Sequence, residues 1–370
     1  MPDRRNVLHL LQDFRLLPVF VLFSMAAGIF LGKLYGISNY HLTPPIDAIH
    51  SILLGNYQFT LSNSLALGVV IGLFLMMYPA MTNVRFEDLG KAFRSSKQLV
   101  VVILFNYLVA PFLMLLLAKL FLSGEKDMYT GLVLYGLAPC IAMVIVFTFL
   151  ARGNNALAIV LVAMNSIIQM ILIPVYSKLL LGEVGFDVWV VAESVVLYLG
   201  LPLVAGFLTR KIWLKRVGEE GFAKLKSWLD TISILGLLFT LIVMFALKGD
   251  LILTSPLFIL KLAVPMTIFF WSMFALAFFT SWKLGFNYQD SVAIGFNSTG
   301  RDFEIAIAIA ISAFNPTVAL ATVVGPLIEV PVMLVLVWFV KKSQDRLFVP
   351  ALKVEEVLVP ETVEEESTQL

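Results

Sequence analysis

The stretch YTGLVLYGLAPCIAMVIVFTFL, Tyr129–Leu150, limits the folds that this sequence can adopt. It carries no charged residue, and a helix of this length covers about 30 Å, the thickness of a bilayer's hydrocarbon core. Pro139 stands near its middle, where a proline removes one backbone donor and clashes with the preceding turn. The stretch therefore predicts a membrane helix that is broken halfway.

Apolar stretches of this kind recur along the whole chain. Of its 370 residues, 60% are hydrophobic and 14% are charged, and the mean hydropathy is +0.93. A water-soluble domain cannot bury so much apolar surface, so the bilayer is the expected surrounding. The net charge of +1 gives no reason to expect a nucleic acid as a partner.

Ten stretches are long and apolar enough to be membrane spans. They lie at Leu16–Leu34, Leu61–Met81, Leu99–Leu122, Tyr129–Leu150, Leu157–Leu181, Val188–Leu208, Leu229–Leu247, Pro256–Trp282, Ser291–Phe314 and Val318–Val340. The first follows Arg4 and Arg5, as the core of a signal peptide would, but so many later spans predict an uncleaved first helix.

Lys and Arg are unevenly divided between the two sides of these spans, with about nineteen on one side and about five on the other. The rich side holds the N-terminus and the loops Arg85–Lys97 and Arg210–Lys226. Because short cytoplasmic loops carry the excess of positive charge, both termini are predicted to lie in the cytoplasm, with the chain in the plasma membrane. A missed helix would invert every later loop, so the asymmetry supports ten spans.

The spans divide into two halves of five, residues 1–184 and 185–345, followed by an acidic tail, 346–370, that is predicted to be disordered. An odd number of spans per half gives the halves opposite orientations, as in inverted-repeat transporters. A shift of roughly 160 positions lays the fourth span on the ninth and the fifth on the tenth, with Cys140 beside Gly300. The expected fold is an all-α integral membrane protein of two inverted five-helix repeats.

A second break is predicted in the ninth span, where the polar stretch NSTGRDFE, residues 297–304, lies between apolar flanks. Matching breaks in two halves predict a binding site, because freed backbone groups in lipid need protein or a water-filled cavity. The alternative is that Pro139 only kinks a packed helix and that the charges form an internal ion-pair set. The candidate substrate-binding residues are Pro139, Cys140, Asn297, Thr299, Arg301 and Glu304.

Glu329, in Gly325-Pro326-Leu327-Ile328-Glu329-Val330-Pro331, is the clearest ionisable residue inside a span. A charge at a span centre costs about 2.5 to 3.5 kcal/mol on insertion scales, so each one needs a reason. A buried carboxyl group can take up and release a proton, which makes Glu329 the candidate for proton coupling. The alternative is a carboxyl group held neutral by one hydrogen bond. Glu193, in the sixth span, has no evident partner.

Cys140 is the only cysteine, which rules out an intramolecular disulfide and a Cys-cluster metal site. A lone membrane cysteine is commonly just a small apolar residue. At a helix break, however, an inward dipole would favour the thiolate, the form that binds soft ions. No cofactor is expected, and no nucleophile, base and orienting group stand together as an enzyme would need.

Several stretches of this sequence resemble the Acr3-type arsenite efflux permeases. They are LAPCIAMV at Leu137–Val144, VAMNSIIQ at Val162–Gln169, GFLTR at Gly206–Arg210, ATVVGPLIEVPVM at Ala321–Met333, MMYP at Met76–Pro79 and LIVMFALKG at Leu241–Gly249. The resemblance runs from the second span to the end of the tenth. It implies the fold of the bile acid/arsenite/riboflavin transporter superfamily, with broken fourth and ninth helices that cross.

The resemblance also implies residue roles and a function. A fourth-helix cysteine is tied to As(III) transport in that family, and Cys140 matches it, while a required tenth-helix glutamate matches Glu329. As(III) is soft and thiophilic, and its hydroxide is neutral near neutral pH, so one thiolate could hold it without trapping it. The implied function is export of arsenite, with antimonite as a second solute, by antiport against protons.

Two positions depart from the family pattern. Gly300-Arg301-Asp302 stands where a Ser-Asn-Asn-like segment is usual, and Phe147-Thr148 replaces a Trp-Asn pair. Because a cationic Arg301 facing the cavity would favour an anion, the second hypothesis is a sodium-coupled symporter of an organic anion on the same fold. A third hypothesis is a non-transporting receptor or scaffold, against which the retained Glu329 segment argues.

Overall fold

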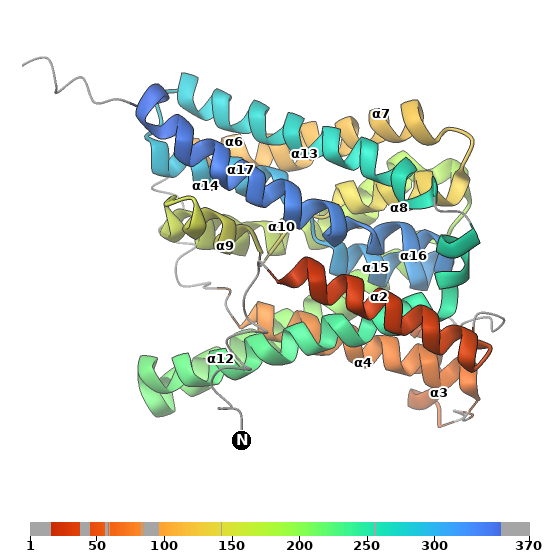
Figure 1. Cartoon of the computed structure of the whole chain (residues 1–370). Helices are drawn as coiled ribbons and strands as arrows, with labels where there is room; N and C mark the ends of the chain where they lie inside the picture. The colour runs from red at the N-terminus through yellow and green to blue at the C-terminus, as the bar shows by residue number, and fades with distance from the viewer. Residues whose placement is uncertain are drawn as a thin grey trace, which may run out of the picture.

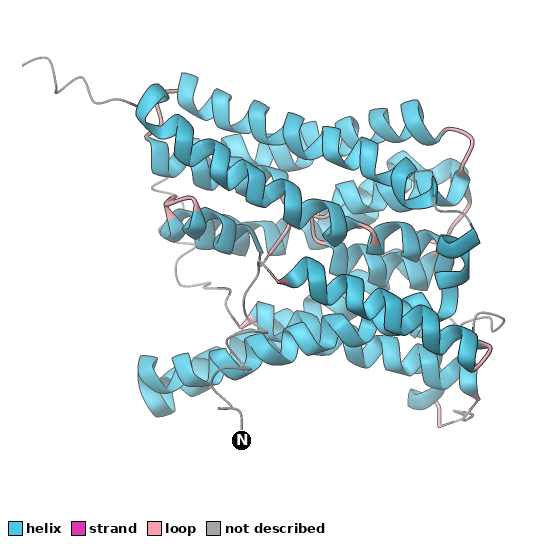
Figure 2. Ribbon diagram, in the orientation of Figure 1, coloured by secondary structure: helices cyan, strands magenta, loops and turns pink. Residues whose placement is uncertain are grey.

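The computed structural model describes residues 16–37, 45–55, 58, 60–82, 84, 96–141, 143–254 and 257–348. Within these ranges every regular element is a helix, joined to the next by turns and short loops, and there is no strand (Figure 2). The basic N-terminal residues, most of the Arg85–Lys97 loop and the acidic tail beyond Phe348 lie outside the described residues.

The helices of the first half follow the predicted spans closely. They are α2 (Leu17–Leu34), α3 (Pro45–Leu53), α4 (Leu61–Met81), α6 (Ser96–Leu104), the π-helical turn η4 (Phe105–Val109), α7 (Ala110–Leu122), α8 (Lys126–Leu137), α9 (Met143–Leu150), α10 (Asn155–Leu181) and the 3₁₀ turn η5 (Gly182–Val184). The third span is α6 and α7, joined through η4. The short helix α3 was not predicted.

The helices of the second half depart further from the predicted spans. They are α11 (Val188–Val195), the π-helical turn η6 (Val196–Gly200), α12 (Leu201–Thr254), α13 (Leu257–Lys283), α14 (Tyr288–Thr299), α15 (Phe303–Ala313), α16 (Pro316–Val323) and α17 (Gly325–Leu347). The tenth predicted span corresponds to α16 and α17, which are separated only by Val324.

Six stretches of the described chain are long and apolar enough to cross a membrane. They are Asn63–Met81, Lys97–Leu122, Asn155–Val184, Val188–Leu247, Leu257–Lys283 and Pro316–Gln344. Large apolar side chains remain exposed on the outside, among them Trp189, Leu120 and Leu179 at 81%, 70% and 65%. Lipid contact explains that exposure, because water would penalise an apolar surface of this kind. The chain is an all-helical, multi-pass integral membrane protein.

The segment predicted as a loop between the sixth and seventh spans is helical instead, because α12 continues through residues 209–228. Only Gly218 leaves helical geometry, with φ 70° and ψ −173°, a backbone conformation that favours glycine. The run of 54 residues is far longer than the roughly 20 that one crossing needs. It therefore consists of two helices joined at Gly218.

The helices form two groups (Figure 1). In that view α2, α3, α4 and α12 lie below the remaining labelled helices. Within the lower group, α12 packs closely on α2, since a Cβ added at Gly32 would lie 2.9 Å from Cα of Ala246. The Ser233 hydroxyl of α12 donates to the carbonyl oxygen of Met76 in α4 at 2.8 Å. The broken helices belong to the upper group.

Two asparagines tie the broken helices together, one from each half. Asn154 caps α10 and donates through Nδ2 to Oδ1 of Asp290, in the first turn of α14, at 2.7 Å. Asn315 caps α16 and donates to Oδ1 of Asp127, in the first turn of α8, at 3.0 Å. The helix that follows each broken helix is thus anchored to the start of the other broken helix.

We expect Asn154→Ala and Asn315→Ala each to lower the free energy of unfolding by about 1 to 2 kcal/mol, because each removes a helix cap and a bond to a carboxylate. Thermal unfolding in detergent measures the loss. The matched control is Asn155→Ala, which removes the neighbouring amide but no cap. Equal unfolding midpoints for Asn154→Ala and this control would contradict the anchoring role.

Candidate functional site

Both predicted breaks are confirmed. In the fourth span α8 ends at Leu137 and α9 begins at Met143. In the ninth span α14 ends at Thr299 and α15 begins at Phe303. Pro139 explains the first break, since it can neither donate nor continue the turn. At the second break Gly300 is extended, with φ −61° and ψ 141°.

The two interrupted segments pair with each other as a short antiparallel bridge between Pro139 and Arg301. The backbone N–H of Cys140 donates to the carbonyl oxygen of Gly300 at 3.0 Å, and that of Asp302 donates to the carbonyl oxygen of Ala138 at 2.8 Å. Backbone groups released from both helices therefore find partners inside the protein, as burial in a membrane requires.

Gly300 marks the point where the candidate thiol and the candidate acid meet. A Cβ added at Gly300 would lie 3.1 Å from Cβ of Cys140 and 3.4 Å from Oε1 of Glu329, and closer still to a methyl group of Val144. Cys140 is buried, with 4% of its surface exposed, and Glu329 is fully buried. Residues far apart in the sequence thus form one site.

Glu329 lies in the second turn of α17 and accepts hydrogen bonds at both carboxylate oxygens. Its Oε1 accepts the backbone N–H of Arg301 at 3.2 Å, and its Oε2 accepts the hydroxyl of Tyr135 from α8. An ionised carboxylate is an acceptor only, so two donors fit the charged form directly. The Glu329 carboxyl group therefore links α17 to α8, the first part of the broken fourth span, and to the second break.

The Arg301 guanidinium points at amide oxygens. Nε donates to the carbonyl oxygen of Thr299 at 3.2 Å and Nη1 to that of Gly136 at 3.4 Å, while Nη2 donates to Oδ1 of Asn106 at 2.8 Å and to the carbonyl oxygen of Ser298. The guanidinium also lies over the Phe269 ring, with Cζ 5.4 Å from the centroid. The side chain is fully buried.

Asp302 serves the opposite helix end. Its Oδ1 accepts the backbone N–H groups of Glu304 and Ile305, both at 3.1 Å, and so caps the N-terminus of α15. Asp302 and Arg301 thus bond to backbone and amide groups and do not form the ion pair that the sequence left open as an alternative. Within the part of the chain that the structure describes, the buried hydroxyl of Ser298 has no hydrogen-bond partner, which leaves a polar atom for a ligand.

A chain of asparagines supports the breaks, and the sequence analysis missed two of its members. Asn165 of α10 donates to Oδ1 of Asn297 at 2.8 Å, and Asn106 of η4 donates to the carbonyl oxygen of Asn297 at 3.2 Å. The sequence could have indicated both residues, because an amide side chain inside an apolar span needs a hydrogen-bond partner. The π-helical turn at Asn106 is seen only in the structure, and such turns are frequent at functional sites. The Thr299 hydroxyl bonds to the carbonyl oxygen of Gly295 at 2.6 Å, so it is already used within its own helix.

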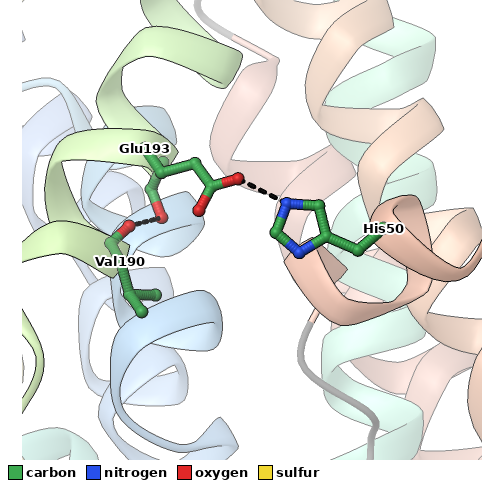
Figure 3. A network of polar contacts seen from close by, with 4 residues as sticks. His50, Val190 and Glu193 are labelled. Carbon is green, nitrogen blue, oxygen red and sulfur yellow. Dashed lines mark hydrogen bonds and ion pairs between the residues drawn. The ribbon is translucent and has the colours of Figure 1, made fainter. Parts of the chain in front are cut away.

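Glu193 does have a partner, contrary to the sequence analysis. Its Oε1 lies 2.7 Å from Nε2 of His50, and both side chains are about half exposed (Figure 3). The partner was missed because His50 stands on α3, outside every predicted span. This pair joins α11 to α3 and is separate from the site at the breaks.

The site offers one thiol rather than a metal cage. Among the described residues, no group of three or more His, Cys, Asp or Glu side chains is placed to hold a metal ion. A thiol at Cys140, a carboxyl group at Glu329 and an unpartnered hydroxyl group at Ser298 are groups that could bind a small thiophilic solute.

Comparisons with known proteins point the same way. The sequence profile of the Sodium Bile acid symporter family matches residues 70–255. The chain is 34% identical to an arsenical-resistance protein Acr3 of Corynebacterium glutamicum over 87% of both chains. It is 39% identical to an Acr3 of Alkaliphilus metalliredigens over 73% of this chain and 80% of that one. It is also 24% identical to a "Probable sodium/metabolite cotransporter BASS2, chloroplastic" of Oryza sativa subsp. japonica, over 78% of this chain and 65% of that one.

Gly300→Ala tests the close approach of the two breaks. The added methyl group would meet Cys140, Val144 and Glu329, so the paired segments must separate. We expect a loss of about 1 to 3 kcal/mol of unfolding free energy, the range for overpacking, measured by thermal unfolding in detergent. Gly182→Ala is the control, because a Cβ there meets nothing within 4 Å. Two equally stable variants would mean that the breaks are not in tight contact.

Proposed function

The chain belongs to the Sodium Bile acid symporter family, together with the Acr3 arsenical-resistance proteins, and we propose that it exports arsenite from the cytoplasm in exchange for protons. Antimonite, which shares the soft pyramidal chemistry of arsenite, is the proposed second solute. The observation that carries the proposal is the meeting of Cys140 and Glu329 around Gly300, where two broken helices pair.

The proposed binding step is an exchange of ligands on arsenic. The sulfur of Cys140 replaces one hydroxyl group of arsenous acid. The S–H bond and one As–O bond break, an As–S bond forms, and the proton and the hydroxide leave together as water. Oxidation states do not change. Because Cys140 is the only cysteine in the chain, no second or third As–S bond can form, and water can reverse the step on the far side.

The proposed proton step uses the two donors at Glu329. When the carboxylate takes up a proton, one of its oxygens becomes a donor and a weaker acceptor, so its hydrogen bond with either the Tyr135 hydroxyl or the Arg301 backbone N–H is weakened. Those donors belong to α8 and to the second break. Protonation of Glu329 would thereby alter how α17 holds the paired segments, which couples proton entry to a change in access.

The alternative is a sodium-coupled symporter of an organic anion. The relative in Oryza sativa that is named a probable sodium/metabolite cotransporter favours it, and so does the buried cation Arg301. Against it, all three guanidinium nitrogens of Arg301 already donate to protein oxygens, which leaves little capacity for an anion. Growth of a sensitive host on arsenite, antimonite and arsenate, and sodium-dependent uptake of organic anions, would separate the two functions.

We further propose that the chain has ten membrane spans arranged as two inverted repeats, 1–184 and 185–345. The six long apolar stretches would account for seven spans if Val188–Leu247 is divided at Gly218. The helix α2 and the two interrupted helices supply the other three. The paired anchors Asn154–Asp290 and Asn315–Asp127 support the repeat, since each half contributes one asparagine and one aspartate. The excess of Lys and Arg on one side supports cytoplasmic termini in the plasma membrane.

Cys140→Ser should reduce arsenite accumulation in everted membrane vesicles at least about tenfold, because a hydroxyl group cannot replace the As–S bond. The substitution is close in size, so its unfolding temperature should stay near that of the unaltered protein. Antimonite transport should fall in parallel. Undiminished arsenite transport by Cys140→Ser or Cys140→Ala would remove the thiol step from the mechanism.

Glu329→Gln should abolish the response of arsenite flux to a proton gradient, because the glutamine side chain does not take up or release a proton near neutral pH. The measurement is arsenite flux from proteoliposomes with and without an imposed pH difference. The control is Glu193→Gln, which removes a half-exposed carboxyl group paired with His50 and should keep the full response. A gradient response that survives Glu329→Gln would assign proton coupling to another group.

A further inference from the structure

The Arg301 guanidinium lies at the meeting point of two helix C-termini. The last carbonyl groups of any helix lack an intrahelical partner. Gly136 lies in the last turn of α8, while Ser298 and Thr299 are the final residues of α14. Arg301 donates to the carbonyl oxygens of all three, and the fourth oxygen comes from the Asn106 side chain. We call these four oxygens the oxygen cage.

The oxygen cage requires a positive charge. Each helix C-terminus carries the equivalent of about −0.5 elementary charge, so two of them together match one monovalent cation. Water does not solvate these carbonyl oxygens, because Arg301 and Asn106 are fully buried. In membrane transporters, carbonyl oxygens freed at helix breaks are the groups that replace the hydration shell of a small cation. The cage therefore has the chemistry of a sodium site.

We propose that the Arg301 guanidinium is a built-in cation that fills this site, so that the protein needs no sodium. The guanidinium is part of the chain and cannot leave the cage with the solute. The backbone of Arg301 is itself fixed, because it pairs with Pro139 and its N–H donates to Glu329. The positive charge stays in the cage throughout the cycle, and the proton on Glu329 becomes the mobile charge. Arg301 thus determines the coupling ion. This inference rests on the proposed transport function for its meaning, but not for its test.

The test removes the built-in cation and offers sodium in its place. Purified Arg301→Ala is heated in detergent in sodium chloride and in choline chloride of equal ionic strength. A ligand that binds only the folded state raises the unfolding temperature. We expect sodium to raise the midpoint of Arg301→Ala by several degrees over choline, and to leave the midpoint of the unaltered protein unchanged.

Three further variants make the test specific. Arg301→Lys keeps a cation in the cage and should remain insensitive to sodium. Adding Asn106→Ala to Arg301→Ala removes one cage oxygen and should weaken the sodium response. Lys261→Ala removes a half-exposed lysine that pairs with Glu125 at 2.7 Å and contributes no atom to the cage, so it should show no response.

Several outcomes would overturn the proposal. They are equal midpoints of Arg301→Ala in sodium and choline, a sodium response of the unaltered protein, and failure of Arg301→Ala to fold even in sodium while Arg301→Lys folds. No arsenite is present in these measurements. A negative sodium result therefore leaves arsenite export standing, and absence of arsenite export would leave a positive sodium result standing.

Discussion

The structure depends on one constraint, which is that backbone polar groups exposed inside a membrane must find partners within the protein. Two helices are interrupted at the breaks, and each interruption alone would leave backbone N–H and C=O groups without hydrogen-bond partners. Paired through Cys140, Gly300, Ala138 and Asp302, they satisfy each other. The position of Cys140, the burial of Glu329 and the need for glycine at position 300 all follow from that pairing.

The same pairing creates an unusual electrostatic situation. Four helix ends come together near the breaks, and three of them have a charged side chain as a partner. The C-termini of α8 and α14 are covered by one guanidinium, while the N-terminus of α15 is covered by the carboxylate of Asp302. Arg301, which the sequence analysis took as a substrate ligand, is therefore engaged with backbone carbonyl groups. The thiol and the Glu329 carboxyl group remain as the chemically variable members of the site.

Sequence reasoning succeeded where the cause is local. Pro139 breaks a helix through its own ring, and the polar stretch at 297–304 interrupts an apolar pattern, so both breaks could be predicted. It failed where the cause is distant. Asn106 meets Arg301 across 195 positions, and His50 meets Glu193 across 143. No spacing rule connects such residues, because their contact exists only after the helices have packed. The helical continuation of α12 was also missed, since basic residues in a solvated helix look like a loop.

The reciprocal anchoring of the two halves has a consequence for biosynthesis. Asp127 is made 188 residues before its partner Asn315, and the backbone of the first break roughly 160 residues before that of the second. At a typical rate of about 5 to 20 residues per second, the ribosome needs on the order of ten seconds or more to deliver them. During that interval the newly inserted fourth helix has open backbone groups and no mate. The backbone groups of the first break therefore cannot find their native partners until the second break has been made.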